Sequence, residues 1–400
     1  MYLVLDLNSY FASVEQQLNP KLRGKPVAVV PSLADTTSCI AASYEAKAFG
    51  IKTGTMVREA KSLCPELILV VGDHKNYIEY HHKILTAIDL CVPIEEVMSI
   101  DEVACKLIGR ETLEENSRKI ALLLKSTISE RVGAYLKSSI GIAPNKFLAK
   151  IASNMQKPDG LTFIRQEELP TKLYSLKLRD FPGIGAAMED RLVRAGIYTS
   201  QQLCAADSTK LKKVWGGIMG EFFYKALRGE NVSRRETERK SFSHSHVLPP
   251  ELRSSEGAYA VAQRLLHKAS VRLRKLNYWC RYLYVSVRYV DGSKWFNETK
   301  MIECQDDLSL IAALQSLWVP PHHKIPMKIS LWMSDLVPDK QHTESFFEDK
   351  KSLTLSKTLD SIQQRFGKEA IYFAGTQKAR RAAPLRISFT NIPDIDLEND

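Results

Sequence analysis

The first eighteen residues, Met1–Leu18, read MYLVLDLNSYFASVEQQL and decide how the chain begins to fold. Met1–Leu7 is an apolar run, Asn8 and Ser9 follow it, and Ala12–Leu18 has the apolar spacing of a helix. This pattern predicts a strand, a sharp turn and a helix. Asp6 then falls at the end of a strand that looks buried.

Strand and helix patterns continue through the front half of the chain. Residues 95–108 predict two short strands around the bend Ser99–Glu102. Further strands are expected at Val27–Val30, Leu67–Val71 and 138–142, and helices at 42–49, 56–63, 74–90, 111–132 and 145–155. This mixture predicts an α+β fold.

The back half changes character twice. Residues 166–230 predict short helices with glycine-bearing turns, and the charged stretch 231–242 predicts a linker. Strands are then expected at 242–247, 280–290, 294–302 and 326–336, with helices at 256–276 and 306–317. This β-α-β-β-α-β order predicts the split ferredoxin-like arrangement, with a basic helix on one face of a small sheet. One more helix, 353–366, precedes an acidic terminus that we expect to be mobile.

The composition is that of an ordinary globular protein. The 400 residues hold 56 Lys plus Arg and 46 Asp plus Glu, a formal charge of 56 − 46 = +10, and 44% are hydrophobic. This length suggests about two to four domains. No apolar run approaches the roughly 20 residues that cross a bilayer, so we expect a soluble cytoplasmic protein. The seven cysteines are scattered and never spaced Cys-x-x-Cys, which predicts reduced thiols.

The positive charge is unevenly distributed along the chain. Residues 1–100 carry 9 − 11 = −2, residues 177–240 carry 13 − 8 = +5, and residues 264–300 carry 9 − 2 = +7. A basic back half fits a polyanion held through phosphate contacts, and a solvated helix face is the alternative interpretation.

Three carboxylates stand at predicted strand ends. Asp6 ends the first strand, and Asp101 and Glu102 occupy the bend almost a hundred residues later. Nucleotidyl transfer needs two hard cations, and hard cations prefer carboxylate oxygens. Turn chemistry at residues 101–102 and a helix N-terminal anion at Asp6 are the structural alternatives.

Four stretches in this order resemble the successive motifs of the Y family of translesion DNA polymerases, and among them bacterial DNA polymerase IV and the catalytic subunit of polymerase V. The stretches are Asp6–Glu15, Ala42–Lys52, Ser99–Glu102 and Gly141–Lys150 with its continuation Lys157–Gly160. The resemblance covers about residues 1–340. It implies an α+β right-hand architecture with a ferredoxin-like palm, small fingers, a helical thumb and a little finger.

The resemblance also implies where these domains lie. They are a palm at 1–10 and 75–165, fingers at 11–74, a thumb at 166–230, a linker at 231–241, a little finger at 242–340 and a C-terminal extension at 341–400.

By the same resemblance, Asp6, Asp101 and Glu102 are the catalytic residues. Asp6 and Asp101 ligate two Mg²⁺ ions, Glu102 completes the site beside the primer 3′-oxygen, and the Leu7 carbonyl is a further ligand. The chain departs from the family at Val103–Lys106, which we interpret as altered packing under the site.

The incoming nucleotide is expected to meet a second group of residues. Phe11 corresponds to the steric gate that excludes a ribose hydroxyl, and Tyr10 lies beside it. Tyr44 and Lys47 are three residues apart on a predicted helix and therefore share one face. They and Lys157 are expected to reach the triphosphate. Lys47 stands where many relatives have Arg, which replaces a bidentate fork by a point charge.

DNA contacts are expected from the thumb and the little finger. Pro182-Gly183-Ile184-Gly185 before a helix predicts a helix-hairpin-helix element, in which Gly183 and Gly185 let backbone N–H groups approach a phosphate. In the little finger, Arg272, Arg274 and Lys275 are the predicted phosphate contacts. Gln341–Phe347 resembles the peptides that dock sliding clamps, although it lacks their leucine.

Together these features predict a template-directed, error-prone translesion DNA polymerase without proofreading, acting on primed DNA and dNTPs as a monomer associated with the nucleoid. A catalytically idle DNA-binding scaffold of the same fold is one alternative, but it conflicts with the three intact acids. A nucleotidyl cyclase is the other, and it leaves the helix-hairpin-helix and the +7 segment without a purpose.

Overall fold

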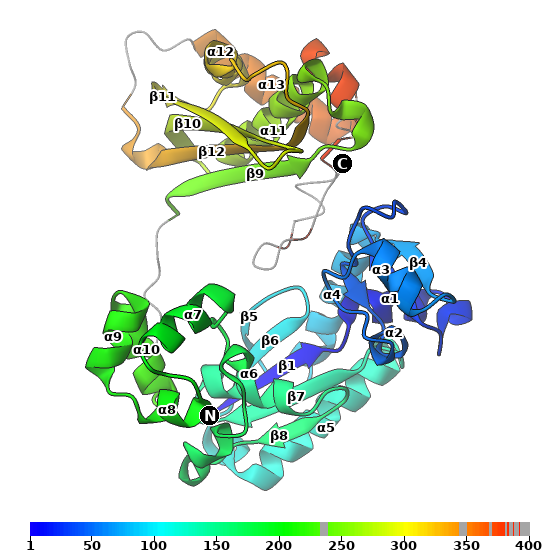
Figure 1. Cartoon of the computed structure of the whole chain (residues 1–400), viewed down its shortest axis with the longest axis vertical. Helices are drawn as coiled ribbons and strands as arrows, with labels where there is room; N and C mark the ends of the chain where they lie inside the picture. The colour runs from blue at the N-terminus through cyan, green and yellow to red at the C-terminus, as the bar shows by residue number, and fades with distance from the viewer. Residues whose placement is uncertain are drawn as a thin grey trace. The chain divides into compact units, whose positions relative to one another are not determined.

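The computed structural model (Figure 1) describes residues 1–232, 239–343, 350–367, 370–380, 382, 383, 387 and 392. The chain divides into two compact units. The first holds residues 1–232 together with 387 and 392, and the second holds the described residues between 239 and 383. Most of the predicted linker and the acidic terminus from 393 onward lie outside the described residues.

A five-stranded sheet forms the centre of the first unit. Its order is β5-β6-β1-β7-β8, and β1 pairs antiparallel with both neighbours. The bounds are β1 Tyr2–Leu7, β5 Ile94–Val97, β6 Glu102–Lys106, β7 Ser138–Ala143 and β8 Leu161–Phe163. Every β1 residue is buried, as its apolar run predicts. The order of β5, β6, β1 and β7 is the ferredoxin-like order expected of a palm, to which β8 adds a parallel strand.

Three helices accompany this sheet, namely α4 (His74–Asp89), α5 (Glu114–Arg131) and α6 (Lys146–Met155). The contact between α6 and β7 is unusually close. A Cβ atom on Gly141 would lie 2.1 Å from the Ala149 carbonyl oxygen and 2.3 Å from the Ser153 nitrogen. Only glycine therefore permits this approach, which sets α6 directly beside the strand that neighbours β1.

The predicted fingers form a smaller sheet in the order β3-β2-β4. Its elements are β2 (Val27–Val30), β3 (Ala41–Ala42) and β4 (Ile68–Val71), with α1 (Tyr10–Leu18), α2 (Tyr44–Ala48) and α3 (Val57–Leu63). A separate apolar cluster that includes Val30, Ile51 and Val57 holds them together.

The predicted thumb consists of α7 (Ala186–Arg194), α8 (Ser200–Ala205), α9 (Ser208–Trp215) and α10 (Ile218–Ala226). Its apolar side chains share one buried cluster with those of β1 and α6. The Asn145 amide donates to the carbonyls of Ala226 and Glu230 at 2.8 and 2.9 Å, which ties the end of the thumb to the palm.

The second unit has the predicted order of elements but not the predicted sheet. Its strands are β9 (Ser241–Val247), β10 (Tyr278–Tyr289), β11 (Lys294–Cys304) and β12 (Pro326–Pro338), with helices α11 (Ser255–Lys275) and α12 (Asp307–Leu317). The sheet order is β11-β10-β12-β9, so the last strand lies between the first two. A ferredoxin-like sheet places the third strand there. The predicted split ferredoxin-like arrangement is therefore wrong for this unit, because strand order depends on long-range pairing.

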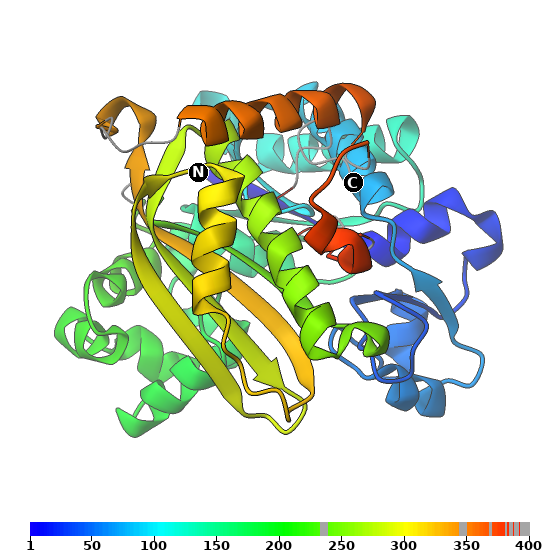
Figure 2. The same cartoon turned by 90° about the horizontal axis from the view of Figure 1, so that it is seen from above.

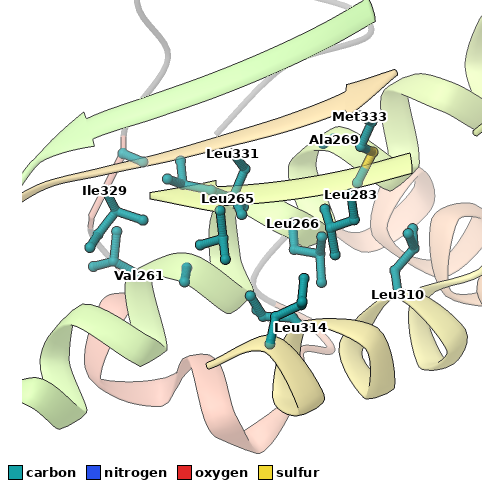
Figure 3. Close-up of a cluster of buried hydrophobic side chains, with 14 of the residues drawn as sticks. Val261, Leu265, Leu266, Ala269, Leu283, Leu310, Leu314, Ile329, Leu331 and Met333 are labelled. Carbon is teal, nitrogen blue, oxygen red and sulfur yellow. The ribbon is translucent and has the colours of Figure 1, made fainter. Parts of the chain in front are cut away.

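Figure 2 shows α11 and α12 crossing the same face of this four-stranded sheet. In Figure 3 the side chains of Val261, Leu265 and Leu266 from α11 meet Leu283, Leu331 and Met333 from the sheet. Leu310 and Leu314 of α12 close the cluster. The opposite face of the sheet is not covered by either helix.

The predicted C-terminal extension contributes to this unit. Helix α13 (Lys350–Phe366) packs against α12, and the short helix η8 (Ala374–Ala379) packs against α11. Residues of the extension therefore complete the unit that the sequence predicts to end near residue 340.

Candidate active site and nucleic-acid interface

The structure brings the three predicted carboxylates together. Asp6 on β1 and Glu102 on β6 are directly paired across the two strands. Asp101 precedes β6, and its carbonyl accepts a hydrogen bond from the Leu7 N–H at 2.9 Å. Asp6 and Glu102 therefore share one rung of the palm sheet, and Asp101 lies on the next position beside Leu7.

Two ammonium groups lie at these acids. Lys150 on α6 donates to Asp6 Oδ2 at 2.6 Å and also to Glu102, and Lys157 donates to Asp6 Oδ1 at 2.6 Å. Lys157 was predicted to reach the triphosphate, and here it contacts Asp6. Lys150 was not predicted as a site residue, although it ends one of the four motifs. The close packing of α6 on β7 is what brings it to the site.

The surroundings shift the pKa values of the three acids in different directions. Burial raises the pKa of Asp101, against the effect of a hydrogen bond that Ser99 Oγ donates at 2.7 Å. Burial likewise raises the pKa of Glu102, against the effect of Lys150. Burial alone would raise the pKa of Asp6 as well, but Lys150 and Lys157 outweigh it and lower that pKa. Positive charge near Asp101 and Glu102 therefore stabilises their ionised forms.

The donor set suits a hard divalent cation. Three carboxylates from adjacent positions supply only oxygen ligands, which Mg²⁺ prefers. In the described part of the chain, no three His, Cys, Asp or Glu side chains converge closely enough to hold a metal ion as they stand. The ammonium groups of Lys150 and Lys157 instead supply positive charge at Asp6. The cluster thus fits a cation in chemistry and in charge.

A buried histidine holds the bend that carries Asp101. His81 on α4 is 3% exposed, and its Nδ1–H donates to the Ile100 carbonyl at 2.8 Å. Burial lowers the pKa of His81 to about 4, so the imidazole is neutral at pH 7. Nothing in the sequence singled out this residue.

Acid should therefore destabilise the first unit. In the unfolded chain His81 takes up a proton near pH 6.5, but the folded chain does so only near pH 4. As pH falls through this window the unfolded state binds more protons, and His81 should account for a loss of up to about 3 kcal/mol by pH 4. Denaturant unfolding at several pH values would show it. His81→Asn should flatten this part of the profile, and the exposed neighbour variant His82→Asn should not.

The predicted steric gate rests on an aromatic platform. The Phe11 ring stacks on Tyr77 with centroids 4.4 Å apart and planes 18° apart. Tyr10 is buried and its hydroxyl donates to the Tyr77 carbonyl at 2.6 Å, so the Tyr10 side chain supports the platform from within. The Tyr77 hydroxyl in turn donates to Glu15 at 2.6 Å. The ring of Phe11 is therefore held by Tyr77, a residue that no sequence motif indicates.

Tyr44 and Lys47 lie on one face of α2, as their spacing predicts. The Lys47 Nζ atom is 4.3 Å from the centre of the Tyr44 ring. Burial lowers the pKa of Lys47, Lys157 lowers it further, and Asp6 opposes both. Burial and the charge of Asp6 raise the pKa of Tyr44. Both residues therefore lie within electrostatic range of Asp6.

The predicted helix-hairpin-helix has the expected backbone. Gly183 has a φ of 89°, which favours glycine, and Gly185 caps the start of α7. No atom lies within 4 Å of a Cβ built on Gly185, so the approach to the first turn of α7 is open. The N–H groups of that turn can meet a phosphate.

The predicted phosphate contact at Arg274 is wrong. Its side chain is buried, and it pairs with Asp307 at 2.9 Å and with Asp360 at 2.6 Å. Arg272 lies over the Phe242 ring at 5.5 Å, whereas Lys275 is exposed at the end of α11.

Other basic residues of the +7 segment are also engaged within the second unit. Arg264 donates to the Ala382 carbonyl at 2.6 Å, Lys268 donates to the Ala383 carbonyl, and Arg281 pairs with Glu303. Much of the charge on α11 therefore stabilises the fold, because residues of the extension cover that helix.

The open face of the second sheet carries a different set of cations. Arg288 on β10 is in register with Lys294 on β11 and with Lys328 on β12, so three positive charges form one row across the sheet. In the described residues no carboxylate lies within ion-pair distance of them. Like charges in register repel each other unless an anion lies over them.

Aromatic side chains accompany this cationic row. Tyr284 stacks with Phe296 at 5.7 Å and meets Trp332 edge-on at 4.8 Å. Phe296 is 62% exposed and Trp332 39% exposed. Sequence reasoning missed this face because it weighted the helix, and the alternation of side chains along β10 was the signal that could have found it.

The predicted clamp peptide is only partly visible, because residues 344–347 lie outside the described residues. Upstream, the His342 ring stacks on Trp279 with centroids 3.6 Å apart. Separately, no helix of the described residues is long and apolar enough to cross a membrane.

Three family models match the chain in succession. They are the impB/mucB/samB family at residues 5–154, the thumb domain of DNA polymerase iota at 179–231, and the impB/mucB/samB family C-terminal domain at 239–346. The first two matched ranges lie in the first unit, and the third begins near the start of the second unit.

Relatives of similar length share about a third of the sequence. DNA polymerase IV of Moorella thermoacetica is 33% identical, over 93% of this chain and 95% of its own. DNA polymerase IV 1 of Bacillus subtilis is 30% identical, over 96% and 95%.

Solved structures share the fold. A chimera of Y-family DNA polymerases is 25% identical with a TM-score of 0.71, and covers 84% of this chain and 100% of its own. The insertion ternary complex of Dbh DNA polymerase is 25% identical with a TM-score of 0.56, over the same shares.

Proposed function

The chain belongs to the Y family of DNA polymerases, and from this premise we propose that Asp6, Asp101 and Glu102 carry out its template-directed nucleotidyl transfer with two Mg²⁺ ions. The protein is a DNA-directed DNA polymerase of the translesion class, and its partners are DNA and dNTPs. Polymerases of this family depend on metal ions. The number of ions and the residues that hold them are the proposal.

One observation carries this assignment. Asp6 and Glu102 face each other on paired strands, and Asp101 joins them through the bond between its carbonyl and the Leu7 N–H. A scaffold without catalysis has no need for three neighbouring carboxylates, because burial raises the pKa of Asp101 and Glu102 and burying such charges costs stability.

When bound, divalent cations would lower the pKa of the primer 3′-hydroxyl and neutralise the triphosphate. Asp6 and Asp101 would hold them with the Leu7 carbonyl, and Glu102 would lie towards the primer end. Lys150 and Lys157 keep Asp6 ionised. Lys157, Tyr44 and Lys47 then lie where they can bind the phosphates of the incoming nucleotide.

Primer extension tests this function directly. The wild-type chain with Mg²⁺ and four dNTPs should extend a primer on an undamaged template and past an abasic site, and chelation with EDTA should stop it. If the chain binds primed DNA but never extends it, the idle scaffold is correct. If it instead cyclises a nucleotide without any DNA, the cyclase is correct.

Sugar discrimination should depend on Phe11. Its ring is held by Tyr77, so it cannot swing away from a ribose hydroxyl. Phe11→Ala should raise ribonucleotide incorporation relative to dNTP incorporation by about 10²-fold or more, because a steric clash worth several kcal/mol is removed. Single-nucleotide insertion with dCTP and CTP measures it. Phe11→Tyr keeps the ring and should retain discrimination, and an unchanged ratio in Phe11→Ala would overturn the assignment.

The row of Lys294, Arg288 and Lys328 is proposed as the phosphate contact of the second unit, in place of Arg274. Each phosphate contact contributes about 0.9 to the slope of log K against log salt. Lys294→Ala with Lys328→Ala should therefore lower the slope by about 1.8. The control is Lys378→Ala, which removes an exposed lysine of η8 that pairs with Glu256. It should leave the slope unchanged. A slope that does not change in the double variant would exclude this surface.

A sliding clamp as partner, the monomeric state and the phosphate contact at Gly183 and Gly185 stay predictions.

A further inference from the structure

Two cysteines of the second unit lie directly opposite each other. Cys280 on β10 and Cys304 on β11 are cross-strand partners in the antiparallel pair. Residues in register on neighbouring strands point to the same face of a sheet, here the side that the helices cover. Both side chains are buried in the apolar cluster of that unit, and both thiols are free.

The two thiols interact with each other. The Cys280 thiol lies 3.5 Å from the Cys304 carbonyl oxygen, and a hydrogen bond between the two thiols contributes to raising the pKa of Cys304. Opposite residues on paired strands have Cβ atoms about 4.5–5.5 Å apart. A disulfide needs about 3.5–4.5 Å, so a small approach is sufficient. All seven cysteines are described, and the other five have no cysteine opposite them in a sheet.

We propose that Cys280 and Cys304 form a reversible disulfide bond when the protein meets a hydroperoxide. In the first step one thiolate attacks the peroxide O–O bond, becomes a sulfenic acid and releases hydroxide or alkoxide. In the second step the other thiol attacks the sulfenic sulfur, and water leaves. With hydrogen peroxide, the sum is two thiols plus peroxide giving one disulfide and two waters.

The second step is fast because the thiols are already neighbours, which replaces an encounter between molecules by a reaction within one site. The first step is slow, because the hydrogen bond with Cys280 and burial raise the pKa of the Cys304 thiol. Two features let an oxidant in. Strand β11 lies at the edge of the sheet, and the register of the pair shifts directly beside Cys280. Such irregularities weaken strand pairing locally.

The disulfide bond would link the edge strand β11 covalently to β10 at Cys304. Arg281 and Glu303, the next residues inward from the two cysteines, form an ion pair, and Glu303 also binds His342. His342 is the second residue of the stretch Gln341–Phe347, which the sequence predicts to be a clamp peptide. Oxidation would thus link the end of β11 to β10 beside the contact between Glu303 and His342.

Mass spectrometry of the full-length wild-type chain tests the proposal. The protein is treated with hydrogen peroxide, its remaining thiols are alkylated, and it is digested without reductant. We expect loss of two of the seven thiols and one linked pair of peptides, containing Cys280 and Cys304 and lighter by two hydrogen atoms. Dithiothreitol should restore both thiols. Oxidation spread over single cysteines without this link, or a link between other cysteines, would overturn it.

Matched variants separate the pair from general oxidation. Cys280→Ser and Cys304→Ser should each lose at most one thiol, as a sulfenic acid, and give no linked peptide at the dose that consumes the wild-type pair. Cys204→Ser, which removes a buried cysteine of the thumb, should still lose two. Oxidised wild type should also unfold at a higher temperature than reduced wild type, because the bond constrains the unfolded chain. If the serine variants fold poorly, the linked peptide in wild type decides the question alone.

Discussion

Asp101→Asn should abolish primer extension while leaving DNA affinity within about twofold, because the change removes one charge without removing volume. Asp101 sits at the head of β6, fixed through its carbonyl to Leu7 and through its carboxylate to Ser99. An amide in that place keeps the shape but no longer attracts cations. Loss of several kcal/mol of transition-state stabilisation predicts a fall in kcat of roughly 10³-fold or more.

Single-turnover extension on preformed complexes measures this change separately from DNA binding. The control is Asp89→Asn, an exposed aspartate at the end of α4 that lies in the same palm. It should extend like wild type. If Asp101→Asn retains more than about a tenth of the wild-type rate, the loss is under 1.4 kcal/mol and Asp101 is not a ligand.

Arg274→Met should destabilise the second unit by about 3–5 kcal/mol, because it leaves the buried carboxylate of Asp307 and the half-buried carboxylate of Asp360 without their partner. Arg274 bridges α12 through Asp307 and α13 through Asp360, and its Nη1 also donates to the Gln305 carbonyl at 2.7 Å. Methionine fills similar volume but carries no charge. The effect should appear first as faster amide exchange in α13.

Calorimetry and hydrogen exchange on the full chain measure this destabilisation. Hydrogen exchange followed by peptide analysis gives separate values for the two units. Arg281→Met is the matched control, because the Arg281 pair with Glu303 is 41% exposed on the arginine side. An exposed pair should contribute at most about 1 kcal/mol. If both variants lower the free energy of unfolding equally, the burial of Arg274 does not explain its contribution to stability.

The helices and strands of this protein were largely predictable because each carries a periodic apolar pattern. Strands β3 and β8 were missed, since two or three residues have no period and exist only through pairing with a neighbour. The order of strands in the second unit could not be predicted either. It depends on β12 entering between β9 and β10, which no local pattern expresses.

The carboxylates of the site were found through a resemblance that no single residue would carry. Lys150, Tyr77 and His81 were not found, because each acts through a contact between segments far apart in the chain. Arg274 shows the reverse error. The basic residues beside it in the sequence suggest that Arg274 is exposed. In the structure it is buried and paired with Asp307 and Asp360.

The long span of the Arg274–Asp360 contact constrains how the protein is made. The two residues are 86 positions apart, so during synthesis the arginine emerges from the ribosome well before its partner. At about 5–20 residues per second, this interval lasts on the order of 4–17 s. The first unit can fold in that time from its own residues. The second stays incomplete until α13 has emerged, which makes nascent chains of intermediate length the natural substrates for chaperones.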